Sequence, residues 1–385
     1  GCEQMLGWDT GRTLELLSGL SSTSSGPARA MDDLGSQLRA HPVALDAFRD
    51  GNVDRLRAVA PEIAEAVSRY ENVWAWRPFN YEPGSTTLAE RPDLLVRQVL
   101  DRMDAAPLAA DVRSRRAARV NEARSALRNG ASQQRFDTLL ERAARVYALR
   151  EDNVLWTNNL PSGLIRRVLL EIGRRLCDRG HLGRPQDAAW LHDRELRDAI
   201  AGNAAPDLAR AVARHKAERA WVRAHPGPDV LGAPPPEPPD LRGLPSAART
   251  INQAVVWALG QELGARPASA TDAITGLSVC GGRYTGTARV ILGESAFERL
   301  RPGDVLVCRI TTPAWSPLFA IAGAIVTETG SLLSHAAIVA REHGIPTVIS
   351  IASATRKLHD GDIVTVDGTR GTVVIEKPGA QRRSA

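Results

Sequence analysis

Apolar residues in the first part of the chain recur at intervals of three and four, the spacing of an amphipathic helix that buries one side. Leu94, Leu95, Val99 and Leu100 show this spacing, and residues 164–172 repeat it. Strand-like alternation is nearly absent before residue 224, and breaks that contain Gly or Pro divide the region. We therefore predict an all-α domain over residues 1–224, with roughly eight to ten helices.

The composition changes after residue 224. Eight prolines fall between residues 226 and 245, and such a run favours an extended, semi-rigid segment. An apolar stripe predicts one further helix over residues 249–263. We interpret residues 225–272 as a linker; it is either an ordinary exposed connector or a tether that limits the travel of a mobile domain.

Beyond residue 272 the hydrophobic period becomes two, which predicts strands. The expected strands cover residues 284–292, 305–308, 324–326, 347–349, 363–366 and 372–375. Helices are expected after Pro317 and after Ser334. The predicted fold class is therefore α+β, with an N-terminal helical domain followed by a compact β/α domain over residues 273–378.

His335 stands where the last long helix of this domain begins. A β-branched strand and a Gly-containing loop precede it, and a run of small and aliphatic residues follows it as far as Gly344 and Pro346. The partial positive charge of a helix N-terminus favours a neutral imidazole and, later, any anion bound to it. His335 is either a simple cap of the helix or a carrier of phosphate, and the slim helix that Ala336, Ala337 and Ala340 produce favours the carrier.

The sequence around His335 resembles the phosphohistidine swivelling domain of the phosphoenolpyruvate-utilising enzymes. Gly330, His335 and residues 336–339 match the pattern of that family, and the likeness extends over about the last 110 residues. Ser331 and Leu333 depart from the pattern. An aliphatic residue at position 333 is typical of the branch that resembles rifampicin phosphotransferase, and it leaves the imidazole without an evident orienting partner.

The resemblance implies phosphoryl transfer through a phosphohistidine intermediate, with His335 as the carrier. In that family an ATP-grasp domain charges the histidine, but this chain contains no Gly-rich nucleotide loop with a Lys and Mg²⁺-binding carboxylates. We therefore expect no cofactor and no metal site on this chain, with ATP and Mg on an ATP-grasp-type partner protein or domain. No (β/α)₈ barrel follows the swivelling domain, so pyruvate is not the expected acceptor.

The helical part has a weaker resemblance to the central domain of rifampicin phosphotransferase, which implies that it binds a hydroxyl-bearing small molecule. Residues 68–70, 77–78, 94–95, 150–151 and 169–176 recur there in the same order. Aromatic and cationic side chains at two breaks in the helical pattern suit such a pocket, although the aromatic residues can equally be packing anchors. The substrate-binding candidates are Trp74, Trp76, Arg77, Tyr81, Arg150, Glu151, Trp156, Arg166 and Arg167.

Five residues of the swivelling domain are expected beside the phosphate. Thr311 and Thr312 precede the turn at Pro313, and their hydroxyls are expected to donate to the phosphorylated ring. The other expected neighbours of the phosphate are Gly330, Ser334 and Arg341. His343 lies just over two helical turns after His335, so it is not expected to act as a carrier.

Charge and cysteine usage exclude several other classes of protein. The formal net charge is +5 and the pI is about 9.3, but the arginines are spread among nearly as many acids without interleaved aromatic residues, so nucleic acid is not an expected partner. Cys2, Cys177, Cys280 and Cys308 lie far apart and show no metal-ligand or disulfide pattern. No apolar run could span a membrane and no secretion signal is evident, so we expect a cytoplasmic protein.

Three functions fit these observations. The first is a split, dikinase-like phosphotransferase that passes phosphate from an ATP-charged partner to the hydroxyl of a small molecule. The second is a phosphocarrier or regulatory subunit without an acceptor of its own. The third is a dehydratase, in which phosphorylation activates a hydroxyl that is then eliminated.

Overall fold

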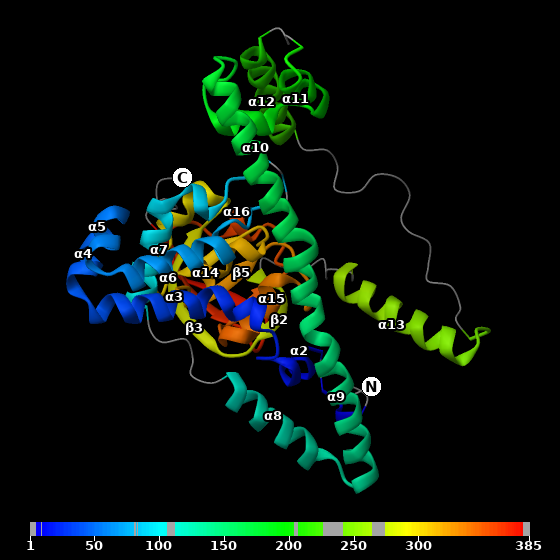
Figure 1. Ribbon diagram of the computed structural model, residues 1–385. Helices are drawn as coiled ribbons and strands as arrows, with labels where there is room; N and C mark the ends of the chain where they lie inside the picture. Colours follow the sequence, from blue (N-terminus) through cyan, green and yellow to red (C-terminus); the bar gives the residue numbers. More distant parts are fainter. Residues whose placement is uncertain are drawn as a thin grey trace.

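The computed structural model describes residues 5–8, 10–80, 82, 84–105, 112–203, 207–225, 242–263 and 274–379. Helices form the N-terminal part, and a mixed sheet with short helices forms the C-terminal part (Figure 1). The predicted α+β class is confirmed. None of the helices in the described ranges combines the length and the apolar character that crossing a bilayer requires.

The first helices form a layer beside the sheet. Three of them begin with Pro at the first helical position, where the missing N–H has no intrahelical partner to lose. The elements are α2 (Thr10–Leu14), η1 (Glu15–Leu17), α3 (Ser22–Ala40), α4 (Pro42–Arg49), α5 (Val53–Val59), α6 (Pro61–Tyr70), η2 (Glu71–Ala75), η3 (Leu88–Glu90) and α7 (Pro92–Asp104). The segment η2 is a π-helical turn that continues α6 without a break.

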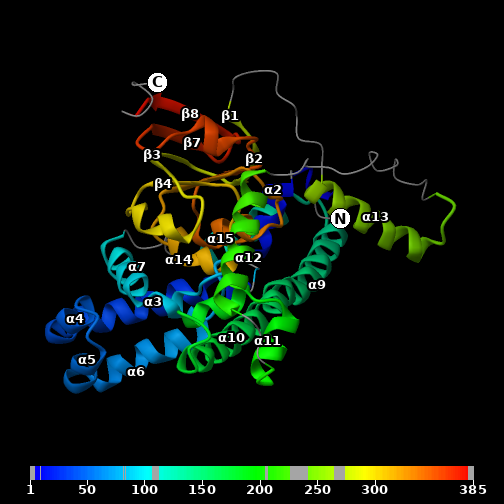
Figure 2. The same ribbon diagram turned by 90° about the horizontal axis from the view of Figure 1, so that it is seen from above.

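The next helices extend away from this layer (Figures 1 and 2). They are α8 (Val112–Ala126), α9 (Gly130–Val154), η4 (Leu155–Asn159), α10 (Leu160–Asp178), η5 (Pro185–Trp190), α11 (Asp193–Ile200) and α12 (Leu208–Ala224). A second π-helical turn, η4, joins α9 to α10 in one long rod. The far end of α10 packs with η5, α11 and α12 around a separate apolar cluster that includes Leu176 and Val212.

Most of the predicted linker lies outside the described residues. Within it the structure shows α13 (Ser246–Leu263), which starts three residues before the predicted helix and ends at the predicted residue. In both views α13 stands apart from the other helices (Figures 1 and 2). The predicted domain limits at residues 224 and 272 stay predictions.

The C-terminal part is an eight-stranded sheet in the order β1-β8-β7-β3-β4-β5-β6-β2. The strands β3 to β6 run parallel, and the remaining pairings are antiparallel. Their bounds are β1 (Ile274–Thr275), β2 (Leu277–Cys280), β3 (Arg283–Val290), β4 (Val305–Cys308), β5 (Ala324–Thr327), β6 (Thr347–Ile349), β7 (Ile363–Asp367) and β8 (Thr372–Lys377). The short helices are η6 (Glu294–Arg299), η7 (Pro313–Trp315), α14 (Ser316–Phe319), α15 (His335–His343) and α16 (Ala354–Lys357).

Alternate residues of the central strands supply two different cores, because successive side chains point to opposite faces of a sheet. Val305 and Val307 belong to a core formed within the C-terminal part. Leu306 and Cys308 belong to a larger core that also contains residues of α3 to α7. The helices α14 and α15 lie between the sheet and these N-terminal helices (Figure 2).

Specific contacts reinforce the packing of the two parts. The ring of Phe79 meets the edge of Phe297 at a centroid distance of 5.1 Å, and the indole N–H of Trp315 donates to the Phe79 carbonyl at 3.2 Å. Both carboxylate oxygens of Glu342 accept from the Gly19 N–H at 2.8 Å. The N-terminal helices and the C-terminal domain are thus docked through a shared, buried interface.

Candidate functional site

The backbone places His335 at the first position of α15. Ser334 is the N-cap, and its hydroxyl accepts from the Ala337 N–H at 3.4 Å. Gly330 has φ +149°, and a Cβ there would lie 3.1 Å from the Ser334 Oγ. Ser334 and Gly330 therefore shape the turn before the histidine, as the sequence pattern of strand, loop and helix predicts.

The imidazole of His335 is half-buried, between α14 and the N-terminal helices. Its Nε2 lies 3.4 Å from the Ser316 Oγ, and the ring of Phe319 is edge-on at 6.0 Å. Ser316 also donates to the Pro313 carbonyl at 2.8 Å. Ser316 is not among the predicted site residues, although its position at the start of a Pro-containing helix could have indicated it. Its hydroxyl supplies the polar contact to the imidazole that Leu333 cannot provide.

Burial lowers the pKa of His335 to about 3, and the nearby positive charge of Arg77 acts in the same direction. A contribution from His343 is smaller. The ring is therefore neutral at pH 7, which is the form that has a nucleophilic nitrogen. The structure thus gives this histidine the protonation state that a phosphate carrier needs.

Arg77 is the cation that the N-terminal part presents to His335. Its side chain is buried, its Nε donates to the Trp74 carbonyl at 3.0 Å, and its guanidinium lies 5.1 Å from the centre of the Trp74 ring. Burial lowers the pKa of Arg77 to about 10, so the guanidinium remains charged at pH 7. A charged group held in this way suits the oxygens of a phosphoryl group.

The start of α10 supports this region. The guanidinium of Arg167 lies 5.0 Å from the centre of the Trp76 ring, and a Cβ at Gly163 would lie 2.5 Å from the Trp76 carbonyl oxygen. Arg166 is 1 % exposed and forms two hydrogen bonds with Glu90, at 2.6 and 3.0 Å. These bonds attach α10 to η3, so the predicted role of Arg166 as a ligand for substrate is not supported by its contacts.

Two predicted neighbours of the phosphate have other surroundings. Thr312 donates to the Phe79 carbonyl at 2.9 Å, so its hydroxyl helps to dock the C-terminal domain rather than facing the ring as a donor. Arg341 lies six residues along α15, about 9 Å from His335 along the helix axis, and lines a separate cavity. Thr311 is buried, and its Oγ1 has no hydrogen-bond partner among the described residues.

Among the remaining predicted substrate residues, the structure describes the side chain of Trp156. Trp156 lies in η4 with 63 % of its surface exposed. Arg150 and Glu151 lie in α9, but their side chains are outside the described part. Tyr81 is also outside the described residues. Trp74 and Trp156 each belong to a π-helical turn, a feature that often occurs at functional sites.

Two family models match the chain. Residues 300–371 match the model described as PEP-utilising enzyme, mobile domain. Residues 2–151 match the model described as rifampicin phosphotransferase fourth domain. The two matches cover the α15 region and most of the helices that pack against it.

Three curated relatives illustrate the similarity. An uncharacterized phosphotransferase, YvkC, of Bacillus subtilis is 34 % identical over 62 % of this chain and 27 % of its own length. A rifampicin phosphotransferase of Streptomyces sviceus is 34 % identical over 54 % of this chain and 21 % of its own length. A rifampicin phosphotransferase of a Streptomyces species is 29 % identical over 96 % of this chain and 42 % of its own length. The chain thus spans less than half the length of these relatives.

Proposed function

We propose that the chain transfers a phosphoryl group through His335 to a hydroxyl-bearing small molecule. The matches to the PEP-utilising mobile domain and to the fourth domain of rifampicin phosphotransferase support this proposal. The donor side is an ATP-grasp-type protein or domain that binds ATP and Mg, and the acceptor side is the helical part of this chain. The observation that carries the proposal is a neutral, helix-capped imidazole that faces the buried, charged Arg77.

The reaction has two displacements at phosphorus. In the first, a neutral ring nitrogen of His335 attacks the donor phosphoryl group, an N–P bond forms, and the bond from phosphorus to the donor oxygen breaks. In the second, the acceptor hydroxyl oxygen attacks phosphorus, the hydroxyl proton passes to a base, and the electrons of the N–P bond return to the ring. The chain finishes with its imidazole neutral, ready for another cycle.

Arg77 supports the second displacement in this proposal. The transition state of phosphoryl transfer spreads negative charge over the equatorial oxygens, and a fixed cation close to them stabilises that charge. Arg77 is held in place by its bond to the Trp74 carbonyl and by the Trp74 ring. The docked arrangement of the structure therefore corresponds to the step in which the helical part receives the phosphate.

The test is phosphorylation of the whole chain by a donor that needs no partner protein. We expect phosphoramidate to produce an acid-labile phosphohistidine that peptide mass spectrometry places at His335. His335→Ala abolishes the label and His343→Ala, the matched control at the other end of α15, keeps it. Equal labelling of His335→Ala and the unaltered chain would reject the carrier role.

Transfer is tested with the ATP-grasp protein or domain of a relative, labelled ATP and hydroxyl-bearing compounds. We expect a product that is heavier than its acceptor by one phosphoryl group, HPO₃, because the acceptor supplies the bridging oxygen. A product that has lost water indicates elimination instead, and a stable phosphohistidine without any product indicates a carrier that has no acceptor of its own.

A further inference from the structure

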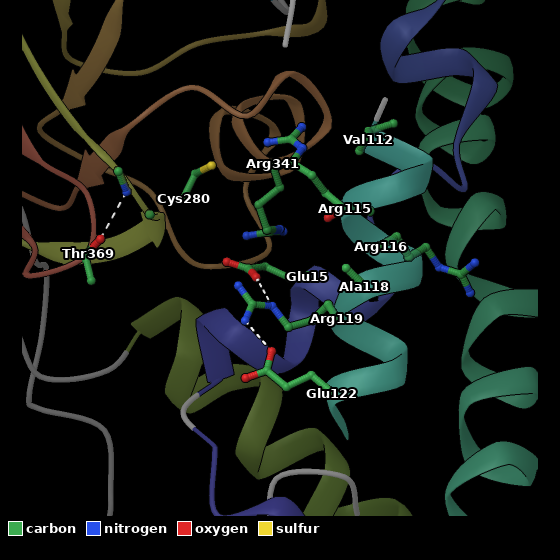
Figure 3. Close-up of a pocket in the computed structure, with 13 residues that line it drawn as sticks. Glu15, Val112, Arg115, Arg116, Ala118, Arg119, Glu122, Cys280, Arg341 and Thr369 are labelled. Atoms are coloured by element: carbon green, nitrogen blue, oxygen red, sulfur yellow. Dashed lines mark hydrogen bonds and ion pairs between the residues drawn. The ribbon is translucent and has the colours of Figure 1, made fainter. Parts of the chain in front are cut away.

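A cavity of about 510 Å³ lies beside the C-terminal end of α15, the end opposite His335, and is also lined by residues of α8 and η1 (Figure 3). Its volume is in the range of sites that hold small molecules. The residues that line it are Glu15, Ser18, Val112, Arg115, Arg116, Ala118, Arg119, Glu122, Cys280, Gly281, Gly282, Arg341 and Thr369. Arginines are the most frequent residues in this lining.

Arg341 is the most unusual residue of the cavity. It is 2 % exposed, and Nε, Nη1 and Nη2 all lack a hydrogen-bond partner among the described residues. A guanidinium is always charged and carries five N–H donors. Leaving such a group buried without an acceptor is costly, so the position of Arg341 indicates a missing anionic partner.

Arg115 brings a second guanidinium to the same place from α8. A Cβ added to Gly344, the C-cap of α15, would overlap the Nη1 of Arg115, so this side chain lies against the end of α15. Burial raises the pKa of the Cys280 thiol to about 11, and the charges of Arg115 and Arg341, which line the same cavity as this thiol, act in the opposite direction. Neither arginine has an ion pair within the described part of the chain.

The acidic residues of the cavity are already paired. Arg119 donates to Glu15 at 2.7 Å and to Glu122 at 2.6 Å (Figure 3). The Arg116 Nε donates to the Leu16 carbonyl at 2.8 Å, and its side chain points away from Glu15 in Figure 3. Arg115, Arg116 and Arg341 therefore have no carboxylate partner among the described residues, and of these three Arg341 is the one that is buried without any hydrogen bond.

We propose that this cavity binds a phosphate-bearing small molecule, whose phosphate is held by Arg115 and Arg341 together. Guanidinium groups match the geometry of phosphate oxygens, and a dianion can satisfy two of them at once. The glycine backbone at residues 281–282 forms a wall without side chains, which leaves room for the remainder of the ligand. The inference does not depend on the function proposed for His335.

Such a ligand also bridges two parts of the molecule. Arg115 belongs to α8, whereas Arg341 belongs to α15 of the C-terminal domain. A phosphate that is held by both arginines binds more tightly when the two parts are docked than when they are apart, and it therefore favours the docked arrangement. The site is therefore also a place where a phosphorylated metabolite can regulate docking.

Isothermal titration calorimetry with the whole chain tests binding. Inorganic phosphate and pyrophosphate are the probes, and citrate is the carboxylate comparison. We expect saturable binding of at least one phosphate probe that weakens with added salt, and a loss of at least about tenfold in affinity for Arg115→Gln. Arg113→Gln, an exposed arginine of α8 outside the cavity, keeps the affinity unchanged.

Arg341→Met is the second variant, with circular dichroism to confirm that it folds. It should also lose at least about tenfold in affinity. The proposal is overturned if neither phosphate probe binds saturably, if Arg115→Gln binds as well as Arg113→Gln, or if citrate binds more tightly than both phosphate probes. Hydrogen exchange tests the bridging: bound phosphate should protect Val112–Ala126, and unchanged exchange in that helix would reject the regulatory role.

Discussion

The region around His335 and the cavity at the other end of α15 use buried arginine in opposite ways. In the N-terminal part, Arg166 forms two hydrogen bonds with Glu90, and Arg77, whose charge acts on His335, has a carbonyl and an aromatic ring as neighbours. Beside the cavity, Arg341 is buried just as deeply but has no hydrogen-bond partner among the described residues. In the first region the buried arginines have their partners within the chain, whereas in the second region a bound ligand is the proposed partner.

This difference matters for the interpretation of charged residues in the interior. A buried ion pair that is complete shows how a fold holds its elements together, and its removal is costly. A buried charge without a partner lowers the free energy of unfolding, so its retention is better explained by a ligand. Substitutions of Arg166 and Arg341 therefore allow the two cases to be compared by their effects on the free energy of unfolding of the same chain.

The largest expected effect is that of Arg166→Ala. The substitution removes both hydrogen bonds from Arg166 to the mostly buried Glu90 carboxylate and leaves only those from Thr87. Breaking a buried pair typically costs about 3–5 kcal/mol of the free energy of unfolding. Chemical denaturation followed by circular dichroism measures the loss. Arg167→Ala is the control, since this neighbour only stacks on Trp76 and should cost about 1 kcal/mol. Equal effects of the two substitutions would remove the contrast between the two regions.

Acid should lower the free energy of unfolding, because the histidines at both ends of α15 are buried in their neutral form. Burial lowers the pKa of His335 to about 3 and that of His343 to about 4, so the unfolded chain binds more protons between these values and about 6.5. Stability is therefore complete above about pH 6.5 and declines as the pH falls toward 4.

Denaturation at several pH values measures this effect. His335→Ala and His343→Ala should each flatten the acid decline, whereas His181→Ala, at an exposed position, should leave the slope unchanged. If the slope of the unaltered chain equals that of the double variant His335→Ala and His343→Ala, the two rings do not titrate in the way that their burial requires.

Gly344→Ala should have an effect of about 1 kcal/mol or somewhat more. Gly344 has φ +69°, and its Cβ would overlap Arg115, so both the backbone and the guanidinium must adjust. Gly361→Ala is matched for backbone strain, with φ +83° and only an ordinary contact for its Cβ. We expect Gly344→Ala to be the more destabilising of the two by thermal denaturation, and to weaken phosphate binding; the reverse order would place Arg115 elsewhere.

The smallest expected effect on stability is that of Arg341→Met. Removal of a buried charge that has no partner relieves a desolvation cost, and Met preserves much of the side-chain volume. We therefore expect a change within about 1 kcal/mol in the absence of ligand, measured by chemical denaturation in phosphate-free buffer. A loss as large as that of Arg166→Ala would show that Arg341 has a structural partner after all.

Much of the C-terminal domain could be predicted because its signals are local. The runs of β-branched residues gave the strands at residues 305–308 and 347–349 with their observed limits, and the Gly-containing loop before His335 placed this residue at a helix start. The short strand β2 was not predicted, because its pairing with β6 joins residues about 70 positions apart and leaves little local pattern.

The surroundings of the site residues were harder to predict. Glu90 lies 76 residues before Arg166, and no spacing in the sequence indicates that they meet. Arg341 is expected beside the phosphate, but it lies six residues after His335 on α15 and lines a separate cavity. Thr312 was expected to donate to the ring, whereas packing brings the Phe79 carbonyl to its hydroxyl. In each case a long-range contact decides the role.

The half-buried position of His335 has a kinetic consequence under the proposed function. While the ring faces Arg77 and the N-terminal helices, no donor can reach it. Phosphorylation of His335 by the donor and transfer from His335 to the acceptor must therefore occur in separate arrangements of the domains. The acceptor hydroxyl therefore attacks the phosphohistidine only after the donor has left His335. Initial rates measured against both substrates should therefore give parallel double-reciprocal lines, the signature of a ping-pong enzyme.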